Sequence, residues 1–588
     1  MTGGRLTNCG KARGHRGRPI TDTHWGCVSA VKSRGNVNAD ADTAEPGSNT
    51  EKRGKVISVD SRKFWKTPGS YSMKQVEPHK NTQMLEMAKA EMGDKNTNQD
   101  ILAPEESSLV QLKEPLKIVH LDLKGAAPKI TYFEQIFPLL STLGATGVLL
   151  EYEDMFPYEG NLTILRSPYA YSLEDIKKIR TLAKLNNLEV IPLVQVFGHL
   201  EFILKHEKFV KLREVAAFPN SLNPLAPGTG ALVIDMATQV LSKHPETRWF
   251  HIGADEVFGL GQSQESQNWL HANGGTVGKL FLNHVTTVSH AIVEKHPGIR
   301  LLMWDDMIRA SNVDDIKKSH LPRIASPVIW KYLPDFDPEN IKSLISKYET
   351  SGFKSVWFAS AFKGASGIDQ RWTPVEHHLK NHLVWLKVIE SMPKYPSISY
   401  QGIVLTGWQR YEHFSVLCEL LPVAIPSLVV CLQALKYDGN MNKAKGEADH
   451  ILGCSVQLEK GICEGSGAFP GSELYHMIYH IHTNLQQETD NMMNNFKGIF
   501  TRYHKKYNFG NPRNLGFYIV KLKKLQQNWE TYLNNFRIQL EAIYFPDTVE
   551  EWMEENVNQH MDSLQSTVED VERIIALNGR PKLTSALL

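Results

Sequence analysis

The chain has 588 residues and a mass of 66.5 kDa, and 41% of its residues are hydrophobic and 22% charged. These proportions are typical of a soluble globular protein with a large core. The formal net charge of +1 gives no reason to expect a nucleic acid or an anionic membrane as a partner.

Residues 1–112 form a polar extension that is rich in Lys, Asn, Gly and Ser. Its apolar residues do not recur at helical or strand spacing, so we expect it to be disordered. The segment 1–40 is basic and has no apolar run long enough for the core of a signal peptide. These features predict a protein of the cytoplasm or nucleus.

Two further features bear on the compartment. The apolar stretch 416–435 is interrupted by Glu419, Pro422 and Pro426, so it predicts no helix that spans a bilayer. The chain has six cysteines and no CxxC pair, which is typical of free thiols in a reducing compartment. They are at positions 9, 27, 418, 431, 454 and 463.

Eight short apolar runs occur between residues 113 and 438, and helical patterns such as 173–185 and 341–348 separate them. The runs are 118–122, 147–151, 190–194, 249–252, 301–304, 328–330, 356–358 and 403–406. This alternation predicts a (β/α)8 barrel of the TIM type. An open doubly wound sheet is the alternative, although no Gly-rich phosphate loop follows the first run. Pro192 in the third run is a mild objection to a strand there.

Residues 439–588 have a different pattern. Apolar residues recur at three- and four-residue spacing in 474–500, 516–544 and 549–577, which predicts an all-α C-terminal region. Packing on the barrel and association into a homodimer are both compatible with this pattern.

Reactive groups in such a barrel lie at the carboxyl ends of the strands. Carboxylates and tryptophans are both frequent there, and this combination suits a sugar, because aromatic walls pack on its C–H faces and carboxylates bind its hydroxyls. The candidate site residues are Asp122, Lys124, Glu151, His199, Asp255, Glu256, Trp304, Asp305, Trp330, Trp357, Trp408 and Tyr411.

Asp255 and Glu256 are the most informative pair, because they directly follow the apolar run 249–252. Two adjacent anions raise each other's proton affinity, which suits acid/base chemistry in a cleft. On a regular strand these neighbours would point to opposite faces, so they can share a pocket only where the pleat ends. The alternative is a solvated strand end whose carboxylates cap the next helix.

The segment 251–257, His-Ile-Gly-Ala-Asp-Glu-Val, resembles the H-x-G-x-D-E-V signature of the family 20 glycoside hydrolases, the β-N-acetylhexosaminidases. The order of other landmarks is similar, with Gly198-His199 after the third run, Trp304-Asp305 after the fifth and Trp408 after the eighth. The resemblance covers roughly residues 116–437. It implies exo-acting removal of a terminal β-linked N-acetylgalactosamine or N-acetylglucosamine from a glycoside or glycoconjugate, without a metal or another cofactor.

The resemblance also implies a mechanism in which the substrate supplies the nucleophile. The oxygen of its 2-acetamido group attacks C1 and forms an oxazolinium intermediate. Asp255 then orients the acetamido N–H, and Glu256 protonates the leaving oxygen and deprotonates the incoming water.

Two positions depart from the family pattern. Lys124 stands where many members have an Arg that grips the sugar's 3- and 4-hydroxyls, and an ammonium cannot make the same forked contacts. The resemblance implies a preference for galactosaminides, which this replacement leaves open. The Tyr that usually contacts the acetamido oxygen is not evident in 356–362, where Trp357 is the substitute.

Two other functions remain open. A metal-dependent barrel isomerase or hydrolase could use Glu151, His199, Asp255 and Asp305 as ligands, and chelators would inhibit it. A barrel that binds sugar without cleaving it is the second alternative, although such a protein has no use for a costly pair of adjacent acids.

Overall fold

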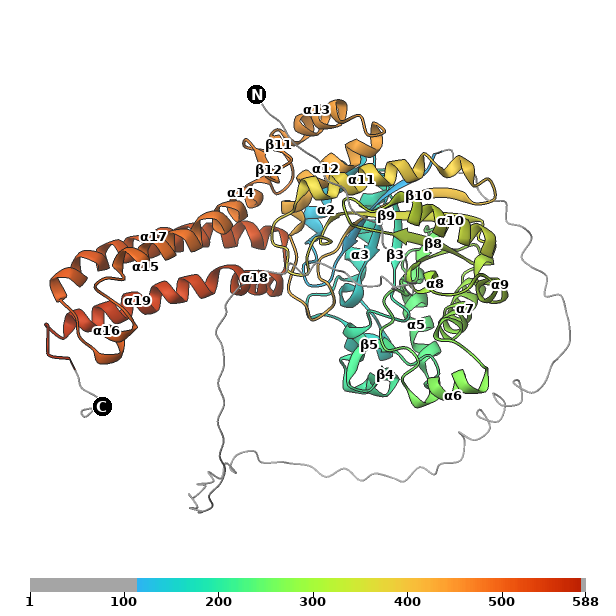
Figure 1. Ribbon diagram of the computed structural model, residues 1–588, viewed down its shortest axis with the longest axis horizontal. Coiled ribbons are helices and arrows are strands. Elements are labelled where there is room, and N and C mark those ends of the chain that lie inside the picture. Colours follow the sequence, from blue (N-terminus) through green and yellow to red (C-terminus); the bar gives the residue numbers. More distant parts are fainter. Residues whose placement is uncertain (1–113, 583–588) are drawn as a thin grey trace, which may run out of the picture. The chain divides into compact units, whose positions relative to one another are not determined.

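The computed structural model describes residues 114–582, so the extension predicted over residues 1–112 lies outside the described part of the chain. Eight parallel strands close into a barrel in the order β1-β10-β9-β8-β7-β6-β3-β2 (Figure 1). The strands are β1 (Leu116–Asp122), β2 (Gly147–Glu151), β3 (Glu189–Leu193), β6 (Trp249–His251), β7 (Arg300–Trp304), β8 (Ala325–Trp330), β9 (Ser355–Lys363) and β10 (Ser399–Gly407). Each overlaps one of the eight predicted runs, so the predicted (β/α)8 barrel is confirmed.

Helices lie between successive strands and cover the outside of the barrel. The long ones are α2 (Ile130–Thr142), α3 (Leu173–Leu185), α5 (Thr229–Ser242), α7 (Val277–Lys295), α10 (Pro338–Ser351), α11 (Val375–Ile389) and α12 (Leu421–Lys436). Short elements in the loops are η1 (Glu153–Met155), η2 (Gly160–Leu165), α4 (Glu201–Leu204), η3 (Glu207–Leu212), α6 (Gln264–Ala272), α8 (Asp306–Arg309), α9 (Val313–Lys318), η4 (Leu321–Arg323), η5 (Met392–Lys394) and the hairpin of β4 (Arg213–Val215) and β5 (Phe218–Leu222). The helices predicted at 173–185 and 341–348 are α3 and part of α10.

The core has two layers because side chains alternate along each strand. On β1, Ile118 lies inside the barrel with Leu149 and Leu302, whereas Val119 packs against the surrounding helices. Pro192 is accommodated in β3, which joins β6 at the single register position Leu193↔His251, the shortest ladder of the barrel.

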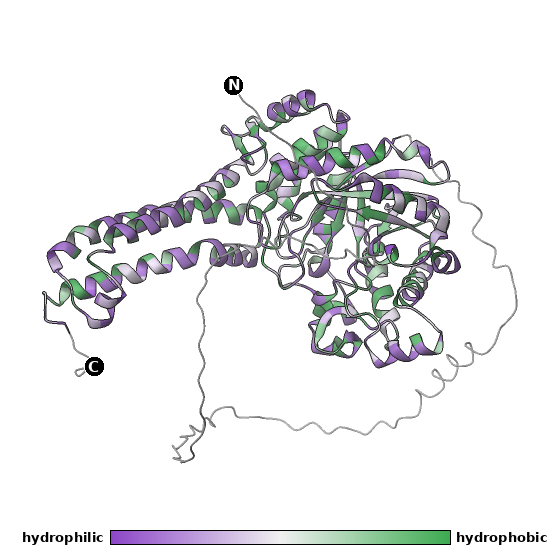
Figure 2. Ribbon diagram, viewed as in Figure 1, coloured by the Kyte–Doolittle hydropathy of each residue, from purple (hydrophilic) through white to green (hydrophobic). Residues whose placement is uncertain are grey.

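The C-terminal region begins after α12 and is almost entirely helical. It contains α13 (Met441–Leu452), α14 (Ser472–His480), η6 (Ile481–Leu485), α15 (Gln486–Phe496), α16 (Arg502–Tyr507), α17 (Pro512–Ile543), α18 (Pro546–Met553), η7 (Glu554–Asn558) and α19 (Gln559–Ala576). The helices α15, α17 and α19 lie side by side (Figure 1) around a core that includes Phe496, Leu522 and Val568. Figure 2 shows long hydrophilic faces on α17 and α19, while hydrophobic residues are concentrated in the barrel strands. The all-α prediction is confirmed apart from one small hairpin.

That hairpin, β11 (Ser455–Gln457) and β12 (Ile462–Glu464), corrects the expectation of free thiols. It brings Cys454 and Cys463 together, and they form a disulfide. The two cysteines are nine residues apart in sequence, so a search for CxxC spacing could not find the pair. Cys418 and Cys431 are free and buried.

The apolar stretch 416–435 contributes to α12, in which residues 421–435 are all buried against the barrel and the C-terminal region. Within residues 114–582, no helix combines the length and the apolar character that a membrane span requires.

Candidate active site

The segment that follows β6 leaves the pleated conformation at once. Gly253, Ala254 and Glu256 have φ of 62°, 67° and 44°, in the left-handed region that costs non-glycine residues energy. This turn ends the alternation of the strand, so the side chains of Asp255 and Glu256 are directed to one place. His199 Nε2 lies 3.5 Å from Asp255 Oδ2 and 3.2 Å from Glu256 Oε2. A single imidazole therefore contacts both carboxylates.

The charge of this group favours a protonated histidine. Burial alone would lower the pKa of His199, but the two adjacent carboxylates raise it well above its ordinary value. Burial raises the pKa of Asp255, and this shift is opposed by His199 and by a hydrogen bond from Gln195.

Gln195 lies just beyond β3 and was not among the predicted site residues. Its Nε2 donates to Asp255 Oδ1 at 3.0 Å, and its Oε1 accepts the Ala254 N–H at 3.0 Å. A Cβ at Gly253 would lie 2.0 Å from the same Oε1. Gln195 thus holds both Asp255 and the turn that presents it. The only signal in the sequence was a polar residue within an apolar run.

Asp306 and Asp305 have different surroundings although they are adjacent. Asp306 Oδ2 accepts the Glu256 N–H at 2.9 Å, and its Oδ1 accepts from Trp330 Nε1 at 3.3 Å. Burial and the nearby Asp255 raise the pKa of Asp306 to about 7. Asp305, a predicted site residue, is instead fully buried and accepts from Arg309 Nε at 2.7 Å and from Tyr348 Oη at 2.8 Å. The hydrogen bonds of its carboxylate are therefore made with Arg309 and Tyr348 and not with Glu256.

Lys124 lies at the centre of a cluster of buried acids. Its Nζ is 2.8 Å from Asp122, 3.8 Å from Glu153 and 4.0 Å from Glu151, and only 3% of the residue is exposed. Asp122 also accepts the Gln409 N–H at 2.7 Å, which ties β1 to the end of β10.

Three carboxylates compete for this one ammonium. Burial would raise the pKa of Glu151, but Lys124 and His120 lower it to about 2. Burial raises the pKa of Glu153 to about 8, which Lys124 only partly opposes. Glu153 therefore holds a proton near neutral pH. Lys124 then has fewer negative charges to balance than the three acids beside it would carry if all were ionised.

Three of the four predicted tryptophans gather at the mouth. The rings of Trp304 and Trp408 are 5.7 Å apart, and Trp330 stacks on Tyr332 at 5.2 Å. Tyr411 is half-buried near Glu256, and burial and this carboxylate raise the pKa of its hydroxyl.

Trp357 is fully buried deeper in the barrel, where its ring lies edge-on against Trp249 at 5.1 Å. The structure does not bring Trp357 to the mouth. Tyr332, which follows β8, is the aromatic residue there that the sequence reasoning missed.

Comparison with known proteins identifies the family. The Glycosyl hydrolase family 20 catalytic domain matches residues 135–344. Human hexosaminidase D is 44% identical over 466 residues, which cover 78% of this chain and 95% of that protein. Hexosaminidase D of Bos taurus is 52% identical over 340 residues, or 58% of this chain and 97% of that one. The chain belongs to glycoside hydrolase family 20.

The predicted family resemblance is thus confirmed, and this family 20 chain is a glycoside hydrolase of the β-N-acetylhexosaminidase type. Among solved structures, a β-N-acetylhexosaminidase from Bacteroides fragilis aligns with 64% of this chain and 71% of that one, at 14% identity and a TM-score of 0.39.

The metal-dependent alternative gains no support from the geometry of this family 20 site. Across residues 114–582, no group of three or more His, Cys, Asp or Glu side chains is arranged to hold a metal ion. Of the four ligands that this alternative requires, Asp305 is bound to Arg309 and Tyr348 instead.

Proposed function

We propose that this enzyme removes terminal β-linked N-acetylhexosamine from glycosides by substrate-assisted catalysis, with a preference for galactosaminides. The observation that carries the proposal is the contact of His199 with both Asp255 and Glu256. This contact keeps the two carboxylates beside one another although their surroundings differ. A general acid and a group that orients the substrate need such an arrangement at one reacting centre.

In the first step, the acetamido oxygen forms a bond to C1 while the bond from C1 to the leaving oxygen breaks. Glu256 transfers its proton to that oxygen. Asp255 accepts a hydrogen bond from the acetamido N–H and stabilises the positive charge of the oxazolinium. In the second step, Glu256 takes a proton from water, which attacks C1 and restores the acetamide with net retention.

The other mouth residues serve the sugar. Trp304, Trp330 and Trp408 supply apolar walls for the ring and the acetamido methyl, and Tyr411 lies beside the acid. Asp122, Lys124 and Glu151 form the charged side that binds hydroxyls. The preference for galactosaminides rests on the family resemblance alone, because Lys124 is a point charge where the family pattern has a forked Arg and leaves the choice at C4 open. A homodimer and a cytoplasmic or nuclear location stay predictions from the sequence.

The test compares hydrolysis of the p-nitrophenyl β-glycosides of N-acetylgalactosamine, N-acetylglucosamine and galactose, with and without a thiazoline inhibitor. We expect the two acetamido sugars to react, the galacto form faster, and thiazoline to block both. Hydrolysis of the plain galactoside at an equal rate would refute the mechanism, and no turnover of any substrate would favour a sugar-binding barrel.

The role of Glu256 is tested separately with Glu256→Gln. This variant should lose most activity on alkyl glycosides, whose leaving group needs a proton, and keep much more on 2,4-dinitrophenyl glycosides. Equal losses on both substrates would count against Glu256 as the acid.

A further inference from the structure

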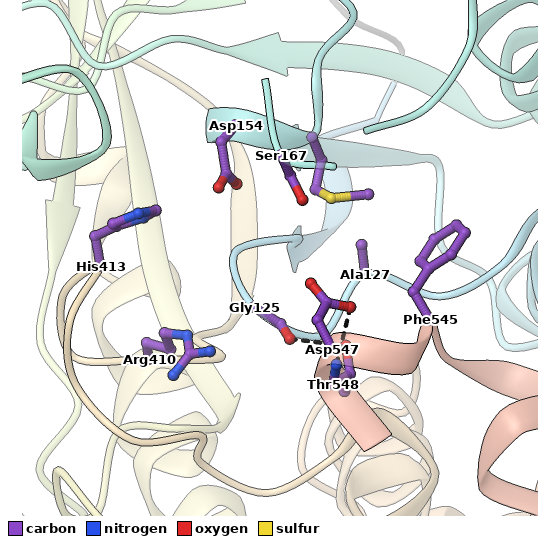
Figure 3. Close-up of a pocket in the computed structure, with 10 residues that line it drawn as sticks. Gly125, Ala127, Asp154, Ser167, Arg410, His413, Phe545, Asp547 and Thr548 are labelled. Atoms are coloured by element: carbon purple, nitrogen blue, oxygen red, sulfur yellow. Dashed lines mark hydrogen bonds between the residues drawn. The ribbon is translucent and has the colours of Figure 1, made fainter. Parts of the chain in front are cut away.

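Two features near the mouth take no part in the proposed reaction. One is a cavity of about 150 Å³ between the barrel loops and the start of α18 (Figure 3). Glu153 separates this cavity from Lys124, because its Oε2 lies 3.1 Å from His413, which lines the cavity, and its Oε1 lies 3.8 Å from Lys124 Nζ. The other feature is the side chain of Asp306, which contacts the proposed acid directly.

Asp306 connects two parts of the site that follow different strands. Its Oδ2 accepts the N–H of Glu256, in the turn after β6, at 2.9 Å. Its Oδ1 accepts from the indole Nε1 of Trp330, at the end of β8, at 3.3 Å. Asp306 itself begins α8, which follows β7, and β6, β7 and β8 are neighbours in the barrel. One carboxylate therefore links the proposed acid to a wall of the sugar pocket.

The contact with Glu256 matters because the backbone there is strained. The φ of Glu256 is 44°, in the left-handed region that costs a residue with a side chain energy. A buried N–H without a partner would add to this cost. Asp306 supplies the partner, and a carboxylate is a stronger acceptor than a neutral group. On the other side of the peptide, the Phe258 N–H donates to the Glu256 carbonyl at 2.7 Å. Asp306 thus stabilises the conformation that directs the Glu256 side chain to the mouth.

The neighbours of Asp306 fix its position. Asp305 is fully buried and bound to Arg309 and Tyr348. Arg309 Nη2 also donates to the Trp330 carbonyl at 2.7 Å, and its guanidinium lies 4.9 Å from the centre of the Trp330 ring. Trp330 is therefore held at its backbone by Arg309 and at its indole by Asp306. The two adjacent acids have separate tasks, because Asp305 anchors the segment and Asp306 reaches the turn.

The two halves of the turn have different supports. Gln195 holds the first half, through its hydrogen bonds with Ala254 and Asp255. Asp306 holds the second half, through the N–H of Glu256. Removal of the Asp306 carboxylate therefore releases Glu256 while Asp255 keeps its hydrogen bond from Gln195. Such a change affects the proposed acid and spares the group that orients the acetamide.

We propose that Asp306 is the positioning residue for Glu256 and holds this acid beside the leaving-group oxygen in register with the Trp330 wall. This inference rests on the proposed function, because it takes Glu256 as the acid. It assigns Asp306 to proton transfer to the leaving group and not to attack by the acetamido oxygen.

The test measures kcat and KM for two N-acetyl-β-galactosaminides that differ in the leaving group. The methyl glycoside needs a proton from the acid, and the 2,4-dinitrophenyl glycoside does not. Asp306→Ala removes both acceptor oxygens. We expect its kcat to fall about 100-fold on the methyl glycoside, as for a misplaced reacting group, and to stay within about fivefold on the dinitrophenyl glycoside. A structural role alone would lower both rates equally.

Asp306→Asn gives the same test in a side chain of the same shape. It keeps one acceptor oxygen, so its loss on the methyl glycoside should be smaller, about tenfold. Asp314→Ala, exposed on α9, is the matched control and should change neither rate.

Equal losses on the two glycosides in both Asp306 variants, or no loss on either glycoside, would overturn the role of Asp306. Glu256→Gln, measured on the same pair, separates this failure from that of the proposed function. If Glu256→Gln spares the dinitrophenyl glycoside and the Asp306 variants do not, only the role of Asp306 fails. If Glu256→Gln also loses both rates equally, the acid itself is wrongly assigned.

Discussion

Gln195 donates to Asp255 Oδ1 from an amide whose orientation is fixed, because its Oε1 accepts the Ala254 N–H. The backbone N–H can only donate, so the NH₂ group must face Asp255. Asp255 Oδ1 is therefore held as an acceptor, and this hydrogen bond favours the charged carboxylate against the burial that raises its pKa. Gln195 is a positioning residue for the group that orients the acetamide.

Gln195→Glu tests this relationship with almost no change of shape. The new carboxylate can still accept the Ala254 N–H, but it repels Asp255 when ionised. We expect kcat to fall about 100-fold at pH 8, similar to the loss of one preorganised donor, and the loss to be smaller at pH 5, where the new side chain can be protonated and donate again. Gln267→Glu, on an exposed helix, is the control. A loss that is independent of pH would contradict the account.

Glu153 should make stability depend on pH. Its pKa in the folded protein is about 8, against about 4.5 for an ordinary glutamate. A raised pKa contributes stability at low pH, and this contribution is lost as the pH rises from about 4.5 through about 8. Compared with Glu153→Gln, the wild type should therefore lose unfolding free energy between pH 5 and pH 8.5 in urea titrations. The surface variant Glu174→Gln should show no such change with pH. A difference in unfolding free energy between the wild type and Glu153→Gln that stays the same from pH 5 to pH 8.5 would refute the raised pKa of Glu153.

Lys124 is the ammonium that the buried acids share, so Lys124→Met should be severe. Removing one member of a buried ion pair costs about 3–5 kcal/mol, because the remaining charges stay buried without a partner. We expect a stability loss of that size in denaturant unfolding and a large loss of kcat/KM on both acetamido sugars. Lys178→Met removes the exposed contact with Glu134 and should cost about 0–1 kcal/mol. Similar losses for the two variants would show that Lys124 is not buried among charges.

The disulfide should stabilise the C-terminal region without affecting catalysis. Closing so short a loop contributes about 2–3 kcal/mol, so Cys454→Ser should lower the unfolding free energy by that amount and leave the kinetics of aryl glycosides unchanged. Mass spectrometry after alkylation of denatured, unreduced protein should find Cys454 and Cys463 unmodified and Cys418 and Cys431 labelled. Labelling of Cys454 and Cys463 as well would contradict the disulfide.

The strands were predictable from the sequence because each has a buried apolar run, but strand ends were less so. β9 continues to Lys363, beyond the run 356–358 that marked it. Trp357 was therefore assigned to the mouth although it lies near the start of its strand. Trp408 was placed correctly because β10 ends one residue before it.

Contacts between distant residues explain the rest. The sequence gives no sign that Arg410 contacts Glu551, because the two residues are 141 positions apart. It also gives no sign that the adjacent Asp305 and Asp306 have different hydrogen-bond partners. The Asp255-Glu256 pair could be predicted from adjacent residues alone. Gln195 and Tyr332 belong to the site through contacts with residues of other strands, which the sequence does not reveal.

The central claim is that the substrate's acetamido oxygen is the nucleophile. The most direct measurement compares kcat/KM for p-nitrophenyl β-galactosaminides whose N-acyl group is acetyl, fluoroacetyl, difluoroacetyl or trifluoroacetyl. Fluorine withdraws electrons from the amide oxygen, so the account predicts a steep and regular fall in rate along the series. A rate that does not change with fluorination would contradict it.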